Sequence, residues 1–277
     1  MKTVAIRDLT IGNDQPLTFL AGPCQLESRD HAFMIAETMA KACADAGAQF
    51  VFKGSFDKAN RTSLTGKRGL GIEEGLRIHE EVRERFGCPV VTDIHTEEQA
   101  ATVGAVVDMV QIPAFLCRQT DLLLAAGHSG AAVNVKKGQF LSPAEMTNVA
   151  DKIASTGNEK ILLCERGTTF GYNNLVADMR SLPIMARTGY PVVMDATHAV
   201  AQPGGLGGAS GGQREFAPVL ARAAVALGVA AVFMETHQDP DNAPSDGPNM
   251  VRLDEMPDLV ASLMRFDALA KETPLRV

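Results

Sequence analysis

The chain repeats one pattern of polarity along most of its length. A short apolar run rich in β-branched residues ends in a polar residue, and a longer segment follows whose apolar positions lie three and four residues apart. Runs of the first kind predict buried strands, and segments of the second kind predict amphipathic helices. The predicted strands are 18–24, 49–56, 89–94, 109–113, 131–137, 160–166, 191–198 and 230–235. The clearest predicted helices are 31–46, 72–86, 143–156 and 214–228.

The length and number of these repeats predict the fold class. The strand ends recur about every 30 residues, which is the length of one strand–helix unit. Eight such units predict an α/β protein of the (β/α)8 TIM-barrel type. A doubly wound open sheet is the main alternative, but it usually carries a glycine-rich dinucleotide turn after its first strand. Gly22-Pro23-Cys24-Gln25 is not such a turn.

The segment before the first predicted barrel strand has its own strand-like pattern. Residues 1–15 are expected to form a short N-terminal β-hairpin that caps the barrel. Its strands are expected within 3–11, with the turn at Gly12-Asn13-Asp14, because glycine and asparagine favour tight turns.

Composition favours one domain in a reducing compartment. The 277 residues have 45% hydrophobic content and no low-complexity linker, so a single domain over 1–277 is expected. The five cysteines are odd in number and lack paired short spacings, which predicts free thiols and a cytoplasmic location. Charged residues near the start are unlike a secretory signal, and the longest apolar run, 223–234, is too short to span a membrane.

The charge pattern argues against one class of partner and for another. A net charge of −7 disfavours nucleic acid, because a phosphate backbone requires a basic face. Four cations nevertheless stand at or just beyond predicted strand ends, namely Lys53, Lys58, Lys136 and Arg166. A single lysine at a strand end is as readily explained by a side chain whose apolar methylenes pack on the protein while its ammonium group reaches solvent. Four cations converging on one barrel mouth predict a cleft for a carboxylate and a phosphate.

A polar segment beyond the second predicted strand offers a second phosphate site. Lys58-Ala59-Asn60-Arg61-Thr62-Ser63 supplies a guanidinium, two hydroxyls and loop amides. These groups commonly bind phosphate oxygens. The alternative is an ordinary polar loop between a strand and a helix.

Four residues of metal-binding type stand at or beyond the ends of predicted strands. Cys24, His198 and Glu235 each close a strand-like run, and Asp246 follows the last run. A thiolate, an imidazole and two carboxylates suit Zn²⁺ or Fe²⁺ better than Mg²⁺ or Ca²⁺. Taken singly, a Cys or His at a strand end is more often a packed core residue. Their recurrence where barrel strands end favours one metal site assembled from distant segments.

Six segments combine such residue types in a fixed order. They are Gly22-Pro23-Cys24, Lys58-Ala59-Asn60-Arg61-Thr62-Ser63, 111–121, 134–140, 165–175 and 233–237. Together they closely resemble the 3-deoxy-D-manno-octulosonate 8-phosphate synthase family, from about residue 16 to residue 260. The resemblance implies a transferase that condenses phosphoenolpyruvate with D-arabinose 5-phosphate and water, releasing phosphate, on the pathway to the lipopolysaccharide sugar Kdo. It also implies a homotetramer of (β/α)8 barrels.

The resemblance implies roles for individual positions. Phosphoenolpyruvate is expected to contact Lys53, Lys58, Gln111, Lys136 and Arg166. Arabinose 5-phosphate is expected to contact Asn60, Arg61, Thr62 and Ser63. Asp93 and Ala114 are further expected substrate-binding residues. The residues expected to act in catalysis are Lys136, His198, Asp246 and Cys24.

The family divides by the residue at the position of Cys24. Members with Cys there depend on a metal and members with Asn do not, so the resemblance implies one divalent ion (Fe, Zn, Mn or Co) in this chain. The implied ligands are Cys24, His198, Glu235 and Asp246. The segment Asp246-Gly247-Pro248-Asn249, in contrast, is of the metal-independent type.

Two other functions fit parts of the pattern. A 3-deoxy-D-arabino-heptulosonate 7-phosphate synthase shares the barrel, the metal and phosphoenolpyruvate but takes erythrose 4-phosphate, and that family typically reads Lys-Pro-Arg-Thr-Ser where this chain has the segment 58–63. A non-catalytic sugar-phosphate-binding barrel is the second alternative, although a decayed enzyme should have lost a ligand or a cation. The glycine-rich segment 204–212 is expected to close over the site.

Overall fold

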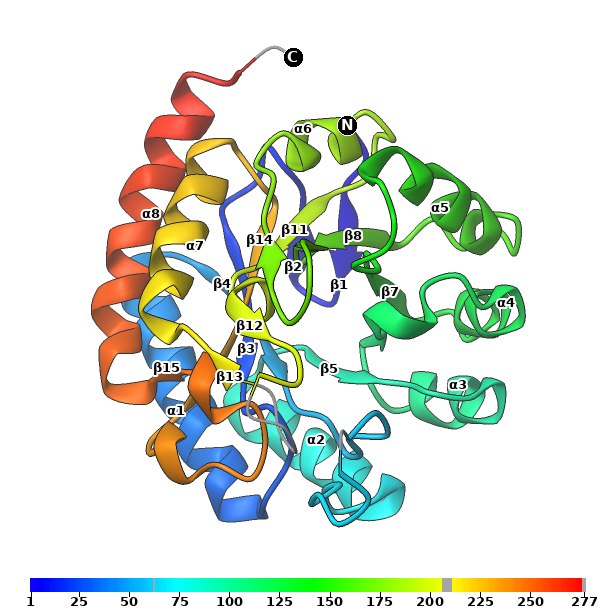
Figure 1. Cartoon of the computed structure of the whole chain (residues 1–277), viewed down its shortest axis with the longest axis vertical. Helices are drawn as coiled ribbons and strands as arrows, with labels where there is room; N and C mark the ends of the chain where they lie inside the picture. Colours follow the sequence, from blue (N-terminus) through cyan, green and yellow to red (C-terminus); the bar gives the residue numbers. More distant parts are fainter. Residues whose placement is uncertain (62, 206–210, 276–277) are drawn as a thin grey trace.

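Eight parallel strands close into a barrel at the centre of the molecule (Figure 1). The computed structural model describes residues 1–61, 63–205 and 211–275. Around the barrel, the strands are β3 (Thr18–Gly22), β4 (Gln49–Lys53), β5 (Val90–Asp93), β6 (Met109–Ile112), β7 (Ala132–Lys136), β8 (Ile161–Glu165), β11 (Val192–Asp195) and β14 (Ala231–His237). Strand β14 pairs with both β11 and β3, which completes the ring. The predicted TIM barrel is therefore confirmed.

A helix follows each barrel strand and packs against the outside of the ring (Figure 1). The helices are α1 (Arg29–Ala46), α2 (Ile72–Phe86), α3 (Glu97–Gly104), α4 (Thr120–His128), α5 (Met146–Ala154), α6 (Ser181–Ala186), α7 (Ala217–Ala226) and α8 (Met256–Glu272). The helices predicted over 31–46 and 72–86 are confirmed as α1 and α2. Those predicted over 143–156 and 214–228 begin with short 3-10 turns, Pro143–Glu145 and Arg214–Phe216, before α5 and α7.

Two apolar layers hold the barrel together. Successive residues of a strand point to opposite faces, so Phe19 and Phe52 pack outward under the helices. Leu20, Val51 and Val91 point inward, where they join other strand residues in a separate cluster. Because side chains fill the barrel interior, a functional site can form only at an end of the ring.

The N-terminal hairpin is present, but its turn lies elsewhere than predicted. Strands β1 (Val4–Ile6) and β2 (Leu9–Ile11) pair antiparallel, with Ile6 opposite Leu9. The chain therefore reverses at Arg7 and Asp8, and Arg7 has the positive φ of 51° that tight hairpin turns require. The placement at Gly12-Asn13-Asp14 was wrong because those residues match the usual turn composition, whereas an arginine seldom adopts this conformation. Val4, Ile6 and Ile11 join the apolar cluster inside the barrel.

Strand β11 is shorter than the predicted run 191–198. It ends at Asp195, whose Oδ1 accepts hydrogen bonds from the His198 amide at 2.9 Å and the Thr197 hydroxyl at 3.3 Å. Such a side-chain turn competes with the strand ladder for the backbone. His198 consequently begins a short 3-10 helix, His198–Val200, above the end of the strand.

Short secondary elements decorate the same end of the barrel. These are β9 (Thr168–Thr169) with β10 (Leu175–Val176), β12 (Ala201–Gln202) with β13 (Gly211–Gly212), and β15 (Val251–Arg252), which pairs parallel with the last two residues of β14. Of the glycine-rich segment 204–212, residues 206–210 lie outside the described residues, so its expected closure over the site stays a prediction. Within the described residues, no helix combines the length and apolarity that crossing a bilayer requires.

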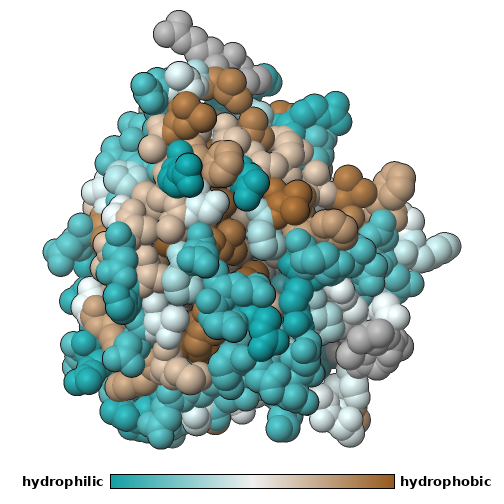
Figure 2. Space-filling model, turned by 90° about the vertical axis from the view of Figure 1, so that its left-hand side faces the viewer, coloured by the Kyte–Doolittle hydropathy of each residue, from teal (hydrophilic) through white to brown (hydrophobic). Residues whose placement is uncertain are grey.

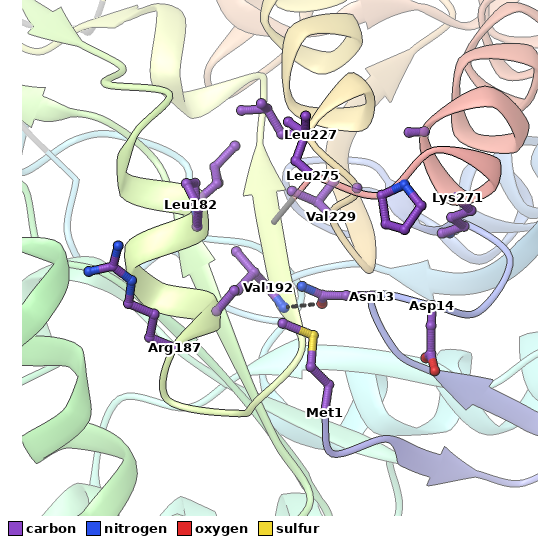
Figure 3. A pocket seen from close by; sticks show the side chains of 15 residues that line it. Met1, Asn13, Asp14, Leu182, Arg187, Val192, Leu227, Val229, Lys271 and Leu275 are labelled. Atoms are coloured by element: carbon purple, nitrogen blue, oxygen red, sulfur yellow. Dashed lines mark hydrogen bonds between the residues drawn. The ribbon is translucent and has the colours of Figure 1, made fainter. Parts of the chain in front are cut away.

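The opposite end of the barrel holds an apolar cavity of about 440 Å³. Its lining includes Val192 at the start of β11 and Val229 before β14, together with Leu182 and Leu227 from the helical layer (Figure 3). The amide of Val192 donates to Asn13 Oδ1 at 3.0 Å, which ties the hairpin region to β11. Figure 2 shows the side of the molecule on which α8 lies, where apolar side chains gather near the C-terminus. This cavity contains few groups that could perform chemistry.

Candidate active site and metal centre

A second, smaller cavity of about 80 Å³ lies at the carboxyl ends of the barrel strands. Most of the predicted site residues line it, namely Lys53, Lys58, Asn60, Asp93, Gln111, Ala114, Lys136, Arg166, His198 and Glu235. Pro113, Phe115 and Gln139 line it as well and were not predicted. The barrel geometry brings these residues together from seven strands because all parallel strands end on one face. Their individual roles remain predictions.

Lys53, the last residue of β4, is 1% exposed and bound entirely by the protein. Its Nζ donates to Glu235 Oε1 at 2.6 Å, to the carbonyl of Cys24 at 2.7 Å and to that of Pro23 at 3.2 Å. An ammonium group has three protons, and these contacts use all three. Lys53 therefore adds positive charge to the cavity and fixes the ends of β3 and β14.

Lys136 and His198 share one buried carboxylate. Lys136 Nζ lies 2.5 Å from Asp195 Oδ2, and His198 Nδ1 lies 2.9 Å from the same oxygen. Burial alone would raise the pKa of Asp195, but the charges of His198 and Lys136 hold it well below its usual value. Asp195 was not predicted, although an acid at the end of an apolar run is a visible signal. Asp195 orients the His198 imidazole so that its Nε2 points away from the Asp195 carboxylate.

Three of the four predicted metal ligands, Cys24, Glu235 and Asp246, have ligand atoms within 4.8 Å of one another, and His198 lies beside two of them. Cys24 Sγ is 3.2 Å from Asp246 Oδ2, and His198 Nε2 lies 3.6 Å from Glu235 Oε2 and 3.9 Å from Asp246 Oδ2. When several atoms bind one zinc ion at about 2.0 to 2.3 Å, the distances between those atoms are similar to the separations found here. Glu235 Oε2 is buried and has no hydrogen-bond partner among the described residues. The donors therefore fit a divalent ion, and Asp195 supplies the carboxylate that commonly supports a metal-binding histidine.

The thiol of Cys24 donates a hydrogen bond to Asp246 Oδ2 and is therefore protonated in this arrangement. Burial, together with the negative charge of Glu235, raises the pKa of Cys24 well above its usual value. A divalent ion favours the thiolate and displaces this proton. Metal uptake at this site should therefore release a proton.

Arg166 presents unused donors to the cavity. Its Nε and Nη1 are buried without a partner in the described parts of the chain. The backbone of Arg166 is fixed by Glu165 Oε1, which accepts the amides of Arg166 at 2.9 Å and Gly167 at 2.7 Å. Fully buried Lys137 lies 3.5 Å from the same oxygen. A guanidinium held with free N–H groups is a ready receptor for a carboxylate or phosphate. Glu165 and Lys137 as supporting residues were not predicted.

Lys58 lies among negative groups. Burial by itself lowers the pKa of Lys58, but the negative charges of Glu235, Asp93 and Asp246 help to raise it well above its usual value. The ammonium group is therefore charged at neutral pH. Asp93 in turn accepts hydrogen bonds from Ser55 and from His95 Nε2, the latter at 2.9 Å.

The predicted second phosphate segment only partly reaches the cavity. Asn60 lines it, but Arg61 donates to Ser245 Oγ and, at 3.0 Å, to the carbonyl of Pro244. Ser63 Oγ lies 3.0 Å from Thr65 Oγ1. Thr62 lies outside the described residues. Arg61 is thus held against the loop that carries Asp246 and does not line the cavity.

Comparison with known proteins agrees with this geometry. The sequence profile of the DAHP synthetase I family matches residues 2–271. A 2-dehydro-3-deoxyphosphooctonate aldolase of Rhizobium meliloti (strain 1021) is 63% identical over 255 residues, which cover 92% of this chain and 91% of the relative. The chain belongs to the 2-dehydro-3-deoxyphosphooctonate aldolase family.

Further members of this family match nearly the whole chain. The protein of Bartonella quintana (strain Toulouse) is 57% identical, and that of Brucella anthropi is 60% identical, each over 97% of both chains. The synthase family predicted from six sequence motifs is thereby confirmed, and the transferase function with it. The relatives' names also weigh against the heptulosonate alternative.

Proposed function

We propose that the chain condenses phosphoenolpyruvate with D-arabinose 5-phosphate and water, giving 3-deoxy-D-manno-octulosonate 8-phosphate and inorganic phosphate. The observation that carries the proposal is the cavity at the strand ends, in which Arg166, Lys58 and Lys136 face one space beside the four metal-type ligands. The names and identity of the relatives support the same reaction.

The positive groups bind and orient the first substrate. Arg166 offers two unpartnered N–H groups, and Lys58 and Lys136 add charge from neighbouring strands. Together they hold the carboxylate and phosphate of phosphoenolpyruvate, so that its enol carbon faces the aldehyde of the sugar. Fixed charges of this kind stabilise the developing anionic groups without reorganising during the reaction.

The reaction forms one carbon–carbon bond and breaks one carbon–oxygen bond. Carbon 3 of phosphoenolpyruvate attacks the aldehyde carbon, whose oxygen takes up a proton. Water adds to the cationic carbon 2 and loses a proton, and the hemiketal then expels inorganic phosphate by cleavage of its C–O bond. Lys136, held beside Asp195, is placed to exchange protons with these oxygens.

A divalent ion belongs to the proposal as a cofactor. Cys24, His198, Glu235 and Asp246 would hold it, and when bound it would polarise the aldehyde or orient the attacking water. The candidate ions are Fe, Zn, Mn and Co, because the donor set combines a thiolate with nitrogen and oxygen. The chain is thus assigned to the metal-dependent class, despite Pro248.

The acceptor sugar is tested by phosphate release. Purified protein with Mn²⁺ is given phosphoenolpyruvate and either arabinose 5-phosphate or erythrose 4-phosphate, and free phosphate is measured over time. Rapid release with the five-carbon sugar alone is expected. Release only with the four-carbon sugar would establish the heptulosonate alternative, and release with neither would favour a binding protein.

A cytoplasmic homotetramer is also proposed, on the basis of the family resemblance and the free cysteines. Light scattering after gel filtration should give about four times the chain mass of 29.4 kDa. A mass equal to one or two chains would contradict the tetramer.

A further inference from the structure

The loop that carries Asp246 has an unusual backbone conformation. Asp246 has a φ of 51°, and within the described residues only Arg7 and Asn173 share a positive φ outside glycine. This left-handed conformation costs free energy for a side chain with a Cβ, and it persists only where the surroundings hold it. The position of this ligand therefore depends on the contacts of the loop.

Two arginines hold the loop from opposite sides. Arg214 Nη2 donates to the carbonyl of Gly247 at 2.8 Å. On the other side, Arg61 Nη1 donates to Ser245 Oγ and Arg61 Nη2 donates to the carbonyl of Pro244. Ser245 is 4% exposed, and its hydroxyl lies 3.4 Å from Asp246 Oδ2. One hydroxyl thus connects Arg61 to the ligand carboxylate.

Arg61 has a second edge that the loop does not use. Its Nε is buried and has no partner in the part of the chain that the structure describes. A guanidinium carries five N–H groups in a rigid plane, so Nε and the second proton of Nη2 can bind an anion while both Nη atoms keep their contacts. Gly66 lies against this edge, where an added Cβ would come within 2.6 Å of Nε, so the anion binds once the segment that carries Gly66 shifts. Arg61 can therefore hold a phosphate and the loop at the same time.

We propose that Ser245 is a positioning residue for Asp246, and that Arg61 links this position to the phosphate of the sugar substrate. The assignment of that phosphate to Arg61 rests on the proposed function. A phosphate on the Nε edge fixes the guanidinium, and the fixed guanidinium holds Ser245 and Asp246 in place for the ion. Sugar phosphate and metal then bind with positive coupling, and the coupling is reciprocal.

The test measures Co²⁺ binding by the full-length protein rather than its activity. Co²⁺ is titrated while the absorption of the cobalt–thiolate bond to Cys24 is followed, with and without saturating arabinose 5-phosphate. We expect the sugar phosphate to tighten Co²⁺ binding by about 5-fold to 20-fold, within the usual range of coupling between sites. Inorganic phosphate, as a second probe, should give a smaller change in the same direction.

Two variants separate the proposed link from a direct contact between sugar and ion. Ser245→Ala should reduce the coupling to less than about 2-fold, although the sugar phosphate still binds. Arg61→Lys should do the same, because an ammonium lacks the second edge. Ser155→Ala, which removes an exposed hydroxyl bonded to the carbonyl of Lys152, is the matched control and should keep the full coupling.

Each result decides one point. Co²⁺ affinity that changes with neither phosphate probe overturns the inference, and so does full coupling in folded Ser245→Ala. If Ser245→Ala fails to fold, the Arg61→Lys variant decides: loss of coupling supports the inference and full coupling overturns it. If arabinose 5-phosphate does not bind while inorganic phosphate still tightens Co²⁺ through Ser245, the proposed substrate is wrong and the link stands.

Discussion

Two clusters of metal-type side chains lie where β3 and β14 end, the first with His198 added from the end of β11, and they differ in how their nitrogen lone pairs are used. The first is the candidate metal centre of Cys24, His198, Glu235 and Asp246. The second cluster consists of Glu27, His31 and His237, whose ligand atoms lie within 4.8 Å of one another, as do those of Cys24, Glu235 and Asp246 in the first cluster. Residue type and proximity alone do not distinguish the two.

Hydrogen bonding separates them. In the second cluster, His237 Nδ1 accepts the amide of Asp239 at 3.0 Å, so Nε2 carries the proton and donates it to Glu27 at 2.8 Å. An ion on this imidazole would have to displace both contacts. In the metal centre, Nδ1 of His198 faces Asp195, and Nε2 faces carboxylate oxygens at 3.6 Å and beyond. His31 Nδ1 is buried without a partner among the described residues, so the difference between the two clusters rests on His237, whose two ring nitrogens are both engaged.

The largest effect should come from removing the metal. Dialysis against a strong chelator should abolish phosphate release, and Mn²⁺, Fe²⁺, Co²⁺ or Zn²⁺ should restore it to different degrees. Elemental analysis should find one ion per chain, because both ring nitrogens of His237 in the second cluster are already hydrogen-bonded within the protein. Two bound ions per chain would show that the second cluster also binds metal. Full activity without metal would refute metal dependence.

Cys24→Asn should produce the next largest change. The amide replaces a soft anionic ligand, so metal affinity should fall by more than about 100-fold. The amide can still hydrogen-bond the water or hydroxyl that an ion would orient, and the family resemblance implies that members with Asn at this position need no metal. We expect low but measurable activity that chelators no longer inhibit. A folded variant that binds phosphoenolpyruvate yet stays inactive with and without metal would show that the ion supplies chemistry an amide cannot.

Asp195→Asn tests the support of the first cluster. Loss of the carboxylate behind His198 should weaken Co²⁺ binding by about 10-fold to 100-fold, as for other residues that support metal ligands. Co²⁺ titration measures this, with Asp254→Asn at an exposed position as a control. If Asp195→Asn binds Co²⁺ as tightly as the wild type, Asp195 stabilises Lys136 and does not support the metal centre.

The smallest effect concerns the second cluster and pH. Burial lowers the pKa of His31 below its ordinary value, so the unfolded chain binds a proton there more readily than the folded one. Stability should therefore fall as the pH drops below about 6.5, the ordinary histidine pKa. His31→Gln should make the urea midpoint less sensitive to pH between 7 and 5 and leave the ion count at one. An unchanged pH dependence would exclude this role of His31.

The sequence predicts the site residues at strand ends far better than the residues that hydrogen-bond and orient these site residues. Lys53, Asp93 and Lys136 each close an apolar run, and a barrel necessarily collects such residues at one face. Asp195 and Lys137 stand close in sequence to predicted residues. Their partners come from other strands, so their contacts cannot be predicted from spacing along the chain. The second cluster was missed for the same reason.

Local backbone geometry was the other source of error. The hairpin turn at Arg7 depends on a positive φ that arginine rarely adopts, and it is stabilised by packing of the hairpin in the barrel. The early end of β11 depends on hydrogen bonds to Asp195. Tertiary contacts override local composition in both cases.

The closure of the ring has a consequence for how the protein is made. Cys24 and Asp246 meet across 222 positions of the chain, and β14 joins β3 only after the other barrel strands exist. A nascent chain on the ribosome therefore has no complete metal centre until nearly all of it has emerged. Metal loading should accordingly be a late, post-translational event, and a cell short of the ion should accumulate finished, empty barrels rather than stalled fragments.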